Sequence, residues 1–382
     1  MTILTTHAGS LPRPRSLVEL YARRARGEDI DEARLAEEGA TATRWVVERQ
    51  RDSGVDIPSD GEQVREAFFL YVQRRMSGFG GRWSRQQGRE LENYPEFAEA
   101  RRQSMANQIA VSNFEPPMAT GPIEYTDPEA NRAEIDGFKA ALDAANGTFA
   151  DAFMTAPSPG IVMAAMKNQY YDSDDDYLNA LATALRVEYE AAVANGLMLQ
   201  IDAPDLALER HISYADRPVR DFVGFVERII ATINRALANV PRDRVRLHVC
   251  WGNYESPHDQ DVALREILPT ILTADVGAFM LPFANPRHQH EINVFKDIPL
   301  AAEQSLIVGV IDTCTNFVEH PEVVAERLER AAEAIGDPDR ILAGTDCGFD
   351  TSAGMSRLTA DVVWAKLRAQ RDGADIANKR LF

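Results

Sequence analysis

Short apolar runs rich in β-branched residues recur along the chain and alternate with amphipathic stretches at helical spacing. Each apolar run ends in small or polar residues, which is typical of a buried strand followed by a turn. These runs lie at residues 2–10, 55–62, 149–160, 197–204, 245–253, 276–285, 306–313 and 340–349. The clearest helical stretches between them lie at residues 176–196, 220–240 and 321–336. Strand–helix alternation indicates a parallel sheet, so eight repeats predict an α/β fold of the (β/α)8 TIM-type barrel class, with an open doubly wound sheet as the alternative.

Residues 63–147 interrupt this alternation. The segment is aromatic and charged, and it is too long for an ordinary strand–helix connection. We interpret it as a long insertion after the second strand, with helical parts and a flexible turn at Gly78, Gly80 and Gly81. A lid over the substrate and a solvated surface excursion explain it equally well. Because barrels of this class tolerate insertions, we expect a single domain over residues 1–382.

Composition excludes several classes of partner. Charged residues make up 26% and hydrophobic residues 45% of the chain, as in soluble globular proteins, and no apolar run approaches the roughly 20 residues of a membrane span. The formal net charge of −18 disfavours nucleic acid and acidic lipid, because phosphate contacts require a basic surface. The N-terminal residues lack the basic start and apolar middle of a signal peptide, so we expect a cytoplasmic protein with reduced thiols.

Acidic and metal-capable side chains follow the apolar runs, at the points where the predicted strands end. They are His7, Asp60, Glu62, Asp202, Asp205, His248, Cys250, Asp312, Asp346 and Cys347. Each alone is more typical of a packed core than of a site. In a parallel barrel, however, these ends converge on one face, where active sites are built, so the set predicts a site.

Two of these residues have the spacing of metal ligands. His248 and Cys250 lie at positions i and i+2, which places both side chains on the same side of a strand. Cys347 follows the last predicted strand, which closes onto the same barrel face. Zinc binds cysteine sulfur and histidine nitrogen in tetrahedral sites, so these three residues are candidate zinc ligands.

The segments TTHAGSLPRP, QIDAP, HVCWGN, GVIDT and TDCGF, between residues 5 and 349, resemble successive motifs of the cobalamin-independent methionine synthase catalytic domain. They are also similar to its stand-alone relatives, including the epoxyalkane–coenzyme M transferases. The resemblance implies a zinc barrel in which the metal presents a thiol substrate as a nucleophile. It matches His248, Cys250 and Cys347 to zinc ligands, and Glu62 and Asp202 to positions that hold the amino group of a thiol such as homocysteine. By the same resemblance, His7 and Ser10 fall in the motif that lines the substrate pocket.

One position departs from the family pattern. The methionine synthases supply a fourth ligand, a glutamate, from the strand after the histidine and first cysteine, and here that position holds Pro282. Three protein ligands with an open position is the ordinary arrangement of catalytic zinc, so the departure is compatible with chemistry. Glu291, His288 or His290 would supply a fourth ligand only by folding back.

The remaining candidates have supporting roles. Arg287 and His288, with His290, stand beyond a strand end, where they could hold an anionic substrate group or cap the surface. Asp312 and Asp346 are interpreted as residues that orient His248 or the substrate. The proton donor that an epoxide would need is sought among His7, Tyr254 and His258. Cys314 is interpreted as a buried apolar cysteine, with a spare thiol near the site as the alternative.

The leading hypothesis is therefore a zinc-dependent S-methyltransferase of methionine biosynthesis. It would transfer a methyl group from a methylated folate or another small donor to homocysteine or a related thiol. The first alternative is addition of an anionic thiol such as coenzyme M to an epoxide. The second is a zinc-free barrel like the uroporphyrinogen decarboxylases, although that chemistry requires no thiolates. The expected partners are a small-molecule thiol and an alkyl donor, and a homo-oligomer is left open.

Overall fold

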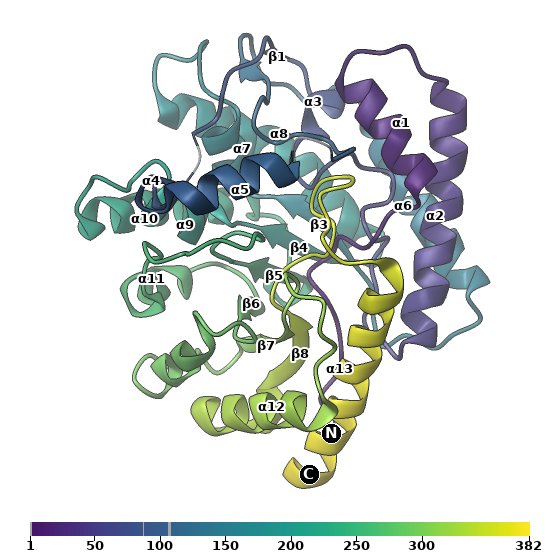
Figure 1. The fold of residues 1–382 in the computed structure, drawn as a ribbon, viewed down its shortest axis with the longest axis vertical. Helices are drawn as coiled ribbons and strands as arrows, with labels where there is room; N and C mark the ends of the chain where they lie inside the picture. Colours follow the sequence, from purple (N-terminus) through teal and green to yellow (C-terminus); the bar gives the residue numbers. More distant parts are fainter. Residues whose placement is uncertain (1, 87, 106–107) are drawn as a thin grey trace.

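The computed structural model describes residues 2–86, 88–105 and 108–382. Six parallel strands lie side by side in the order of the sequence (Figure 1). They are β3 Phe153–Pro157, β4 Met198–Asp202, β5 Val245–His248, β6 Ala278–Pro282, β7 Ser305–Ile311 and β8 Ile341–Thr345. Each lies within one of the predicted apolar runs or within one residue of it. Their side chains are almost all buried, as expected for strands covered on both faces.

Two irregular segments close the sheet into a barrel. The first predicted strand pairs with β8 through a parallel bridge from Thr5 to Ala343, and the second pairs with β3 through a bridge from Ser59 to Phe153. The two segments also contact each other, since the backbone N–H of Ile57 donates to the carbonyl oxygen of Thr5 at 3.0 Å. Eight extended segments therefore surround one interior, which confirms the predicted (β/α)8 barrel class.

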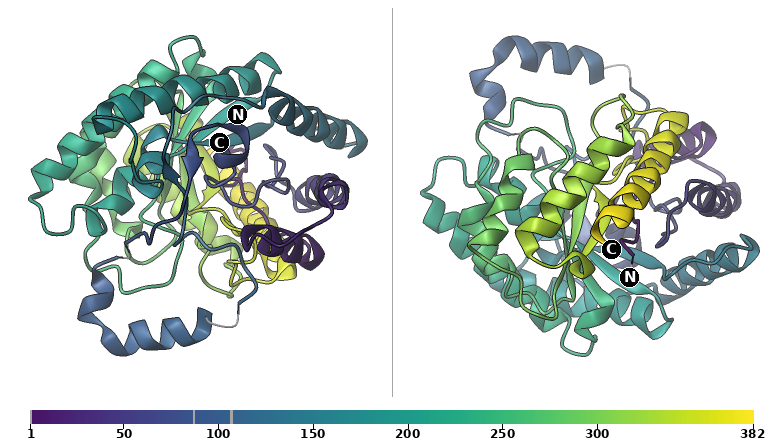
Figure 2. Two further views of the ribbon diagram at one scale, coloured as in Figure 1. Left: turned by 90° about the horizontal axis from the view of Figure 1, so that it is seen from above. Right: turned by 90° about the horizontal axis from the view of Figure 1, so that it is seen from below.

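Helices form the outer layer around these strands (Figure 2). They are α1 Arg15–Ala25, α2 Glu32–Asp52, α6 Pro128–Ala144, α7 Pro159–Ala165, α8 Asp174–Ala194, α9 Asp205–Leu208, α10 Val219–Ala236, α11 Leu264–Ile271, α12 Pro321–Ile335 and α13 Ala360–Leu381. Short 3₁₀ helices complete the connections: η1 Glu209–His211, η2 Arg242–Arg244, η3 Gln289–Lys296 and η4 Pro338–Arg340. Helix starts carry side-chain caps, as at α8, where the Ser173 hydroxyl accepts from the backbone N–H of Asp176.

The insertion after the second strand holds short elements on the rim of the barrel. They are α3 Val72–Arg75, β1 Phe79–Gly80, α4 Glu90–Asn93, α5 Pro95–Met105 and β2 Met118–Ala119. β1 and β2 pair as an antiparallel ribbon, and α4 and α5 stand out from the ring of helices in Figure 2. Gly78 turns the chain before β1 with φ of 86°, and a Cβ there would meet the carbonyl oxygen of Pro122 at 2.5 Å. α6 packs against α2 and α8, so it occupies the place of the barrel helix that precedes β3.

The interior of the barrel is filled by side chains. The guanidinium group of Arg246 in β5 crosses it, donating to the Thr6 hydroxyl at 3.0 Å and to the carbonyl oxygen of His7 at 2.9 Å. Its Cζ atom lies 3.4 Å from the ring centroid of Phe153. Along the described parts of the chain, no helix combines the length and the apolar character that crossing a membrane would need.

Candidate active site

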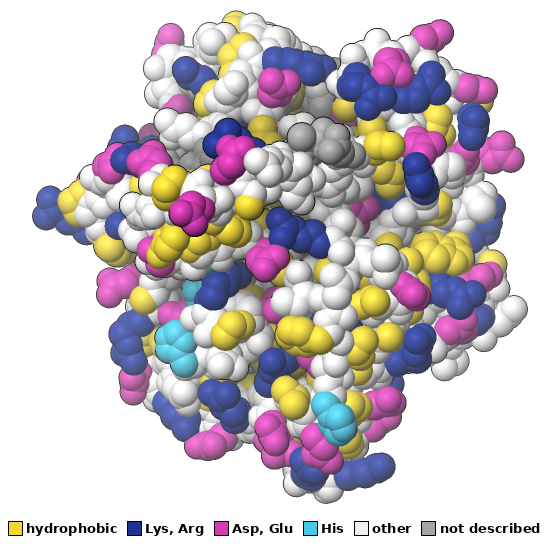
Figure 3. Space-filling view, in the orientation of Figure 1, with side chains coloured by type: hydrophobic (Ala, Val, Ile, Leu, Met, Phe, Trp, Pro, Cys, Tyr) yellow, Lys and Arg dark blue, Asp and Glu magenta, His cyan; other side chains and the backbone are white. Residues whose placement is uncertain are grey.

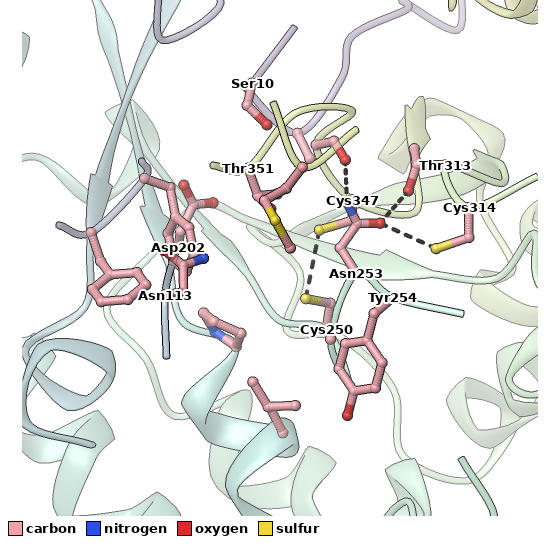
Figure 4. A pocket seen from close by; sticks show the side chains of 18 of the residues that line it. Ser10, Asn113, Asp202, Cys250, Asn253, Tyr254, Thr313, Cys314, Cys347 and Thr351 are labelled. Atoms are coloured by element: carbon pink, nitrogen blue, oxygen red, sulfur yellow. Dashed lines mark hydrogen bonds between the residues drawn. The ribbon is translucent and has the colours of Figure 1, made fainter. Parts of the chain in front are cut away.

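The predicted metal ligands converge at the carboxyl end of the barrel. His248 is the last residue of β5, Cys250 follows it by two residues, and Cys347 lies two residues beyond β8. The two sulfur atoms are 3.8 Å apart, and the ligand atoms of all three residues lie within 4.8 Å of one another (Figure 4). All three side chains are buried. β6 and β7 lie between β5 and β8 in the sheet. The ends of β5 and β8 nevertheless bring together Cys250 and Cys347, which are 97 positions apart in the sequence.

Asp202 fixes the orientation of the His248 ring. The two residues are paired in register at the ends of β4 and β5, and Nδ1 of His248 lies 2.9 Å from Oδ1 of Asp202. Because a carboxylate only accepts, Nδ1 carries a proton, so Nε2 is the nitrogen that presents a lone pair when the ring is neutral. Nε2 is buried and has no hydrogen-bond partner among the described residues. A histidine with one nitrogen held by a carboxylate and the other unpartnered has the form of a metal ligand.

The electrostatics of this cluster favour a cation. The hydrogen bond from Cys347, followed by contact with His248, holds the pKa of Cys250 well below its usual range, while the same hydrogen bond and burial raise the pKa of Cys347. Burial lowers the pKa of His248, but Asp202 and Cys250 outweigh it and raise that pKa to about 10. Without a metal ion, protonated His248 is the cation that faces the Cys250 thiolate and the Asp202 carboxylate, and a metal ion on Nε2 would take the place of that proton. Two sulfurs and one imidazole nitrogen are also the donors that zinc prefers, so the residues present fit a zinc ion.

A cavity of about 200 Å³ opens above the three residues. Its floor includes Ser10, Glu62, Asp202, His248, Cys250 and Cys347, and the side chains in Figure 4 surround the two sulfurs. Residues between 68 and 114, among them Phe68, Arg85, Arg101, Asn113 and Phe114, form a large part of its wall. The insertion therefore shapes the cavity.

Glu62 faces this cavity from a tight turn. Its φ is 58°, and its backbone N–H donates to Oδ1 of Asp60 at 3.0 Å. Oε1 accepts from the Thr155 hydroxyl at 3.0 Å, whereas Oε2 is buried without a partner in the parts of the chain that the structure describes. Burial and the charge of Asp202 raise the pKa of Glu62 to about 8. A cationic group in the cavity would relieve this repulsion between two carboxylates.

A second cavity, of about 220 Å³, adjoins the first at the two cysteines. Pro282, at the end of β6, lines it at the position where the family pattern has glutamate. Glu291 does not fold back toward the cysteines, since its Oε1 accepts from the backbone N–H of Leu264 and its Oε2 contacts His288. His290 is exposed. The group of potential metal ligands found in the described residues thus has three members here.

Asp312 and Asp346 line the second cavity, but neither contacts His248. Asp346 accepts from the backbone N–H groups of Ala284 and Asn285 at 2.8 and 2.9 Å, which ties the end of β8 to the segment after β6. Oδ1 of Asp312 accepts from the backbone N–H of Cys314 at 2.7 Å. The expected contact with His248 is made by Asp202 instead, so orientation of His248 by Asp312 or Asp346 is corrected. A role of either residue toward the substrate stays a prediction.

The two candidate residues of the first motif, His7 and Ser10, point to different places. Ser10 lines the first cavity, whereas His7 is not among the lining residues and lies inside the barrel, with Nε2 2.7 Å from Oε1 of Gln50. Burial lowers the pKa of His7 to about 3, so its ring is neutral. Residues of an extended segment point alternately to opposite sides, which explains why Ser10 lines the cavity and His7 does not; a contact of His7 with substrate stays a prediction.

The two basic residues after β6 differ in their position relative to the cavities. Arg287 and His288 both contact the carboxylate of Asp261, at 3.3 and 2.9 Å, but Arg287 lines the second cavity together with the two cysteines, whereas His288 lines neither cavity. His258 lines only the second cavity, with both ring nitrogens engaged, whereas Tyr254 lines both cavities. The geometry therefore does not support the expected anion-binding role for His288, and for Arg287 that role stays a prediction.

Asn253 is a site residue that strand-end reasoning missed. Its side-chain N–H donates to the carbonyl oxygen of Gly348 at 2.7 Å, and its Oδ1 accepts from the Thr313 hydroxyl at 2.8 Å and from the Cys314 thiol at 3.4 Å (Figure 4). It thereby links the segments that follow β5, β7 and β8. Asn253 belongs to the HVCWGN motif, and this membership is the sequence feature that could have identified it as a site residue. Cys314 lines both cavities, and burial raises its pKa to about 12.

Comparison with known proteins gives a consistent result. Residues 150–374 match the family described as the catalytic domain of cobalamin-independent synthase. The chain is 25% identical to a methionine synthase of Thermococcus kodakarensis over 381 residues, covering 99% of this chain and 94% of the relative. A methionine synthase of Sulfolobus acidocaldarius is 26% identical over 360 residues, covering 91% and 86% of the two chains. Among solved structures, a B12-independent methionine synthase from Shewanella sp. W3-18-1 in complex with selenomethionine superimposes with a TM-score of 0.72, at 21% identity and covering 100% of this chain and 99% of that one.

Proposed function

This chain belongs to the cobalamin-independent synthase catalytic-domain family, and from that premise we propose that it is a zinc-dependent transferase that methylates the sulfur of a small thiol. The thiol is homocysteine or a related amino-acid thiol. The donor is a methylated folate or another small methyl donor. In this proposal the protein acts in methionine biosynthesis, in the cytoplasm.

The observation that carries the proposal is the meeting of three ligand atoms from distant segments. His248 offers an unpartnered, buried Nε2, and Cys250 and Cys347 offer two sulfurs 3.8 Å apart. These three residues would hold the zinc ion. Zinc bound there would supply Lewis acidity that deprotonates a coordinated thiol at neutral pH. A zinc-free decarboxylase would leave this convergence of two thiols and an imidazole unexplained.

The protein's own residues prepare the nucleophile and hold it. Asp202 keeps the proton of His248 on Nδ1, so that Nε2 stays available as a donor. Gln200 donates to the same carboxylate oxygen at 2.7 Å and limits its movement. The residues of the cavity floor are buried, so they would limit the access of water to the sulfur atom of a bound thiol. Charged groups interact more strongly with that sulfur when water is excluded.

The two carboxylates in the cavity favour an amino-acid thiol over an anionic one. Glu62 has an unpartnered oxygen, and burial and the charge of Asp202 raise its pKa to about 8. A substrate ammonium group bound there would favour the ionised form of Glu62 and pair with it. A sulfonated thiol such as coenzyme M would be repelled by the same pair. Of the side chains that could offset that repulsion, His288 contacts Asp261 and lines neither cavity, and Arg287 contacts Asp261 and lines only the second cavity, away from Glu62.

The arginines that line the first cavity support an anionic methyl donor. Arg85, Arg101 and Arg357 contribute to its wall, and two of them belong to the insertion. Arg85 and Arg357 already pair with Glu209 and Glu255, at 2.8 and 2.7 Å, so the carboxylates of a folate would bind to the remaining N–H donors of these guanidinium groups.

The test compares two substrate pairs on the purified, metal-replete protein. We expect methylated homocysteine from homocysteine and methyl-tetrahydrofolate, and no product from coenzyme M and a short epoxide. The Cys347→Ser variant should lose activity and the thiolate-to-metal absorption of the cobalt-substituted protein. Cys314→Ser, which alters a thiol lining the same cavity, should keep that absorption. Product from the epoxide pair alone would replace the proposed methyl transfer with the epoxide reaction, and an unaltered Cys347→Ser variant would overturn thiol activation at this site.

A Glu62→Gln variant tests how the thiol is held. Removing the carboxylate removes the partner of the substrate ammonium group, so we expect KM for homocysteine to rise about tenfold or more, in line with loss of a charged hydrogen bond. A thiol substrate of the same length without the amino group should react equally with both proteins. If KM for both thiols rose together, Glu62 would act through the structure of its turn and not on the amino group.

A further inference from the structure

A second cluster of histidines and a carboxylate lies outside the cysteine site. His211 ends η1, and His258 and Asp261 lie in the long connection between β5 and α11. Nδ1 of His211 and Nδ1 of His258 lie 3.0 and 3.1 Å from the same oxygen, Oδ1 of Asp261. One ligand atom from each of the three residues lies within 4.8 Å of the others. Both histidines are buried, and His258 borders the second cavity.

The hydrogen bonds of His211 and His258 indicate which ring nitrogens carry protons and which carry lone pairs. Nε2 of His258 lies 2.9 Å from the carbonyl oxygen of Tyr254, which only accepts, so Nε2 carries a proton. Nε2 of His211 lies 2.6 Å from the Tyr254 hydroxyl. In a neutral ring the proton on Nε2 of His258 leaves Nδ1 of His258 as a lone pair. Nδ1 of His211 is a lone pair as well when the Tyr254 hydroxyl accepts from Nε2, and two lone pairs then face one carboxylate oxygen. Nδ1 of His211 is buried and makes no hydrogen bond of ordinary geometry to any described residue.

The second oxygen of the Asp261 carboxylate is held by other side chains. Its Oδ2 atom is contacted by Nε2 of His288 at 2.9 Å and by the guanidinium group of Arg287 at 3.3 Å. These contacts hold the plane of the carboxylate while Oδ1 faces the two imidazoles. A ligating carboxylate is commonly hydrogen-bonded in this way, and a ligating histidine commonly donates its second N–H to a carbonyl or hydroxyl.

We propose that His211, His258 and Asp261 form a second metal site, which takes a first-row divalent transition metal such as zinc. Two imidazoles and one carboxylate are a donor set that suits these ions. Tetrahedral zinc with bonds of 2.0–2.1 Å separates its ligand atoms by about 3.3 Å, close to the 3.0 and 3.1 Å found here. The cation replaces two protons that the imidazoles would otherwise need in order to face Asp261.

The site would stabilise the connection that carries Cys250 and Tyr254. His258 has a φ of 53°, a conformation that a non-glycine residue keeps only where its surroundings fix it. Tyr254 stacks on His258 with ring centroids 4.5 Å apart and lines both cavities. A metal bound to His211 and His258 would therefore fix a wall of the substrate cavity from a position outside it.

The test counts metal ions in protein stripped with a chelator and then titrated with Co²⁺. The wild-type protein should bind two equivalents, and a Cys250→Ser/Cys347→Ser variant should bind one. The remaining ion should show visible cobalt absorption without a sulfur-to-cobalt band, since its ligands contain no thiolate. Adding Asp261→Asn to the cysteine variant should abolish binding, while adding His290→Ala, which changes an exposed histidine outside both clusters, should not.

Two further outcomes separate this inference from the proposed function. A folded cysteine variant that binds no cobalt would overturn the second site and leave an imidazolium–carboxylate cluster, whatever the activity of the wild-type enzyme. If the wild-type protein bound two equivalents of Co²⁺ but methylated no thiol, the second metal site would be supported, and only the proposed function would be contradicted. If Asp261→Asn does not fold, the cobalt titration of the cysteine variant still decides, because that protein keeps all three residues of the second site.

Discussion

At the scale of single residues, the orientation of His248 depends on Asp202. The carboxylate holds Nδ1–H at 2.9 Å and leaves Nε2 unpartnered among the residues described. In an Asp202→Asn variant the amide is a weaker acceptor, and its NH₂ group can turn toward the ring, so both tautomers become accessible. We expect metal affinity at the cysteine site to fall about 10–100-fold, the usual loss when such a partner of a ligating histidine is removed.

Chelator competition, followed through the thiolate-to-cobalt absorption, measures this affinity. Asp346→Asn is the informative comparison, because Asp346 precedes Cys347 but contacts Ala284 and Asn285 instead of His248. Its effect on affinity should be clearly smaller. Equal losses in the two variants would mean that neither acts through the tautomer of His248.

The convergence of the three candidate ligands was predictable from the sequence because their chemistry and their position agree. His248, Cys250 and Cys347 are metal-capable residues after strands, and parallel strands end on one face. The partner of His248 was not predictable, because Asp202, Asp312 and Asp346 all follow strands and only the register of β4 with β5 selects Asp202. An isolated sequence carries no such register.

At the scale of secondary-structure elements, a buried charge network joins the insertion to the outer helices. Glu134 of α6 contacts Arg65 at 2.7 Å and also pairs with Arg75, which reaches Glu188 of α8 at 2.8 Å. Tyr71 donates its hydroxyl hydrogen to Glu188 at 2.5 Å. These side chains are almost fully buried, so removing one partner leaves uncompensated charge.

We expect Glu134→Gln to lower the free energy of unfolding by roughly 3–5 kcal/mol at neutral pH. Burial would raise the pKa of Glu134, but Arg65 and Arg75 outweigh it and lower the pKa to about 2. Because the folded-state pKa lies below the unfolded value of 4.5, this stabilisation is present above pH 4.5 and is lost as the pH falls toward 2. Urea denaturation between pH 3 and pH 7 should therefore show a smaller difference between variant and wild type at the acid end.

The control for this network is Glu129→Gln, which changes an exposed carboxylate on the same helix. It should leave the free energy of unfolding within about 0.5 kcal/mol of the wild-type value. A Glu134→Gln variant as stable as this control would show that the buried network contributes no net stability.

The elements differ in how far the sequence could predict them. β3 to β8 lie in short runs in which apolar residues dominate, as in buried parallel strands, and they were recognised by that pattern although β4 and β5 also carry polar residues. The first two segments were recognised as extended, but they pair through isolated bridges, partly because Pro58 has no N–H to donate to a ladder. α6 was assigned to the insertion, since its neighbours α2 and α8 are known only once the barrel is closed.

At the scale of the whole molecule, closure of the barrel rests on the hydrogen bonds that its N-terminal segment makes to the segments on both sides. Thr6 donates its backbone N–H to Ala343 at 2.8 Å, and Thr5 accepts from Ile57. Arg246 adds two hydrogen bonds from the opposite side of the interior, to Thr6 and His7. Ser10 and Glu62, which line the first cavity, follow the two segments that close the ring. The cavity therefore depends on this closure.

An Arg246→Met variant tests that dependence. Burial lowers the pKa of Arg246 to about 9, which reflects the cost of a charge with no carboxylate in hydrogen-bond contact, so removing it relieves a penalty. The same change leaves the His7 carbonyl without its Arg246 donor, at about 1–3 kcal/mol, while the Thr6 hydroxyl keeps its hydrogen bond to the carbonyl oxygen of Ile57. These effects oppose each other in global stability, but only the second acts on the N-terminal segment. We therefore expect hydrogen exchange of the Thr6 and Ala343 amides to accelerate at least tenfold while exchange of the β4 and β5 amides changes little. We also expect kcat/KM to fall in the same variant.

Arg242→Met, which removes a half-exposed arginine paired with Glu303 just before β5, should leave both measurements unchanged. Equal acceleration in every strand would instead mean that Arg246 stabilises the barrel as a whole and has no particular role in closing it.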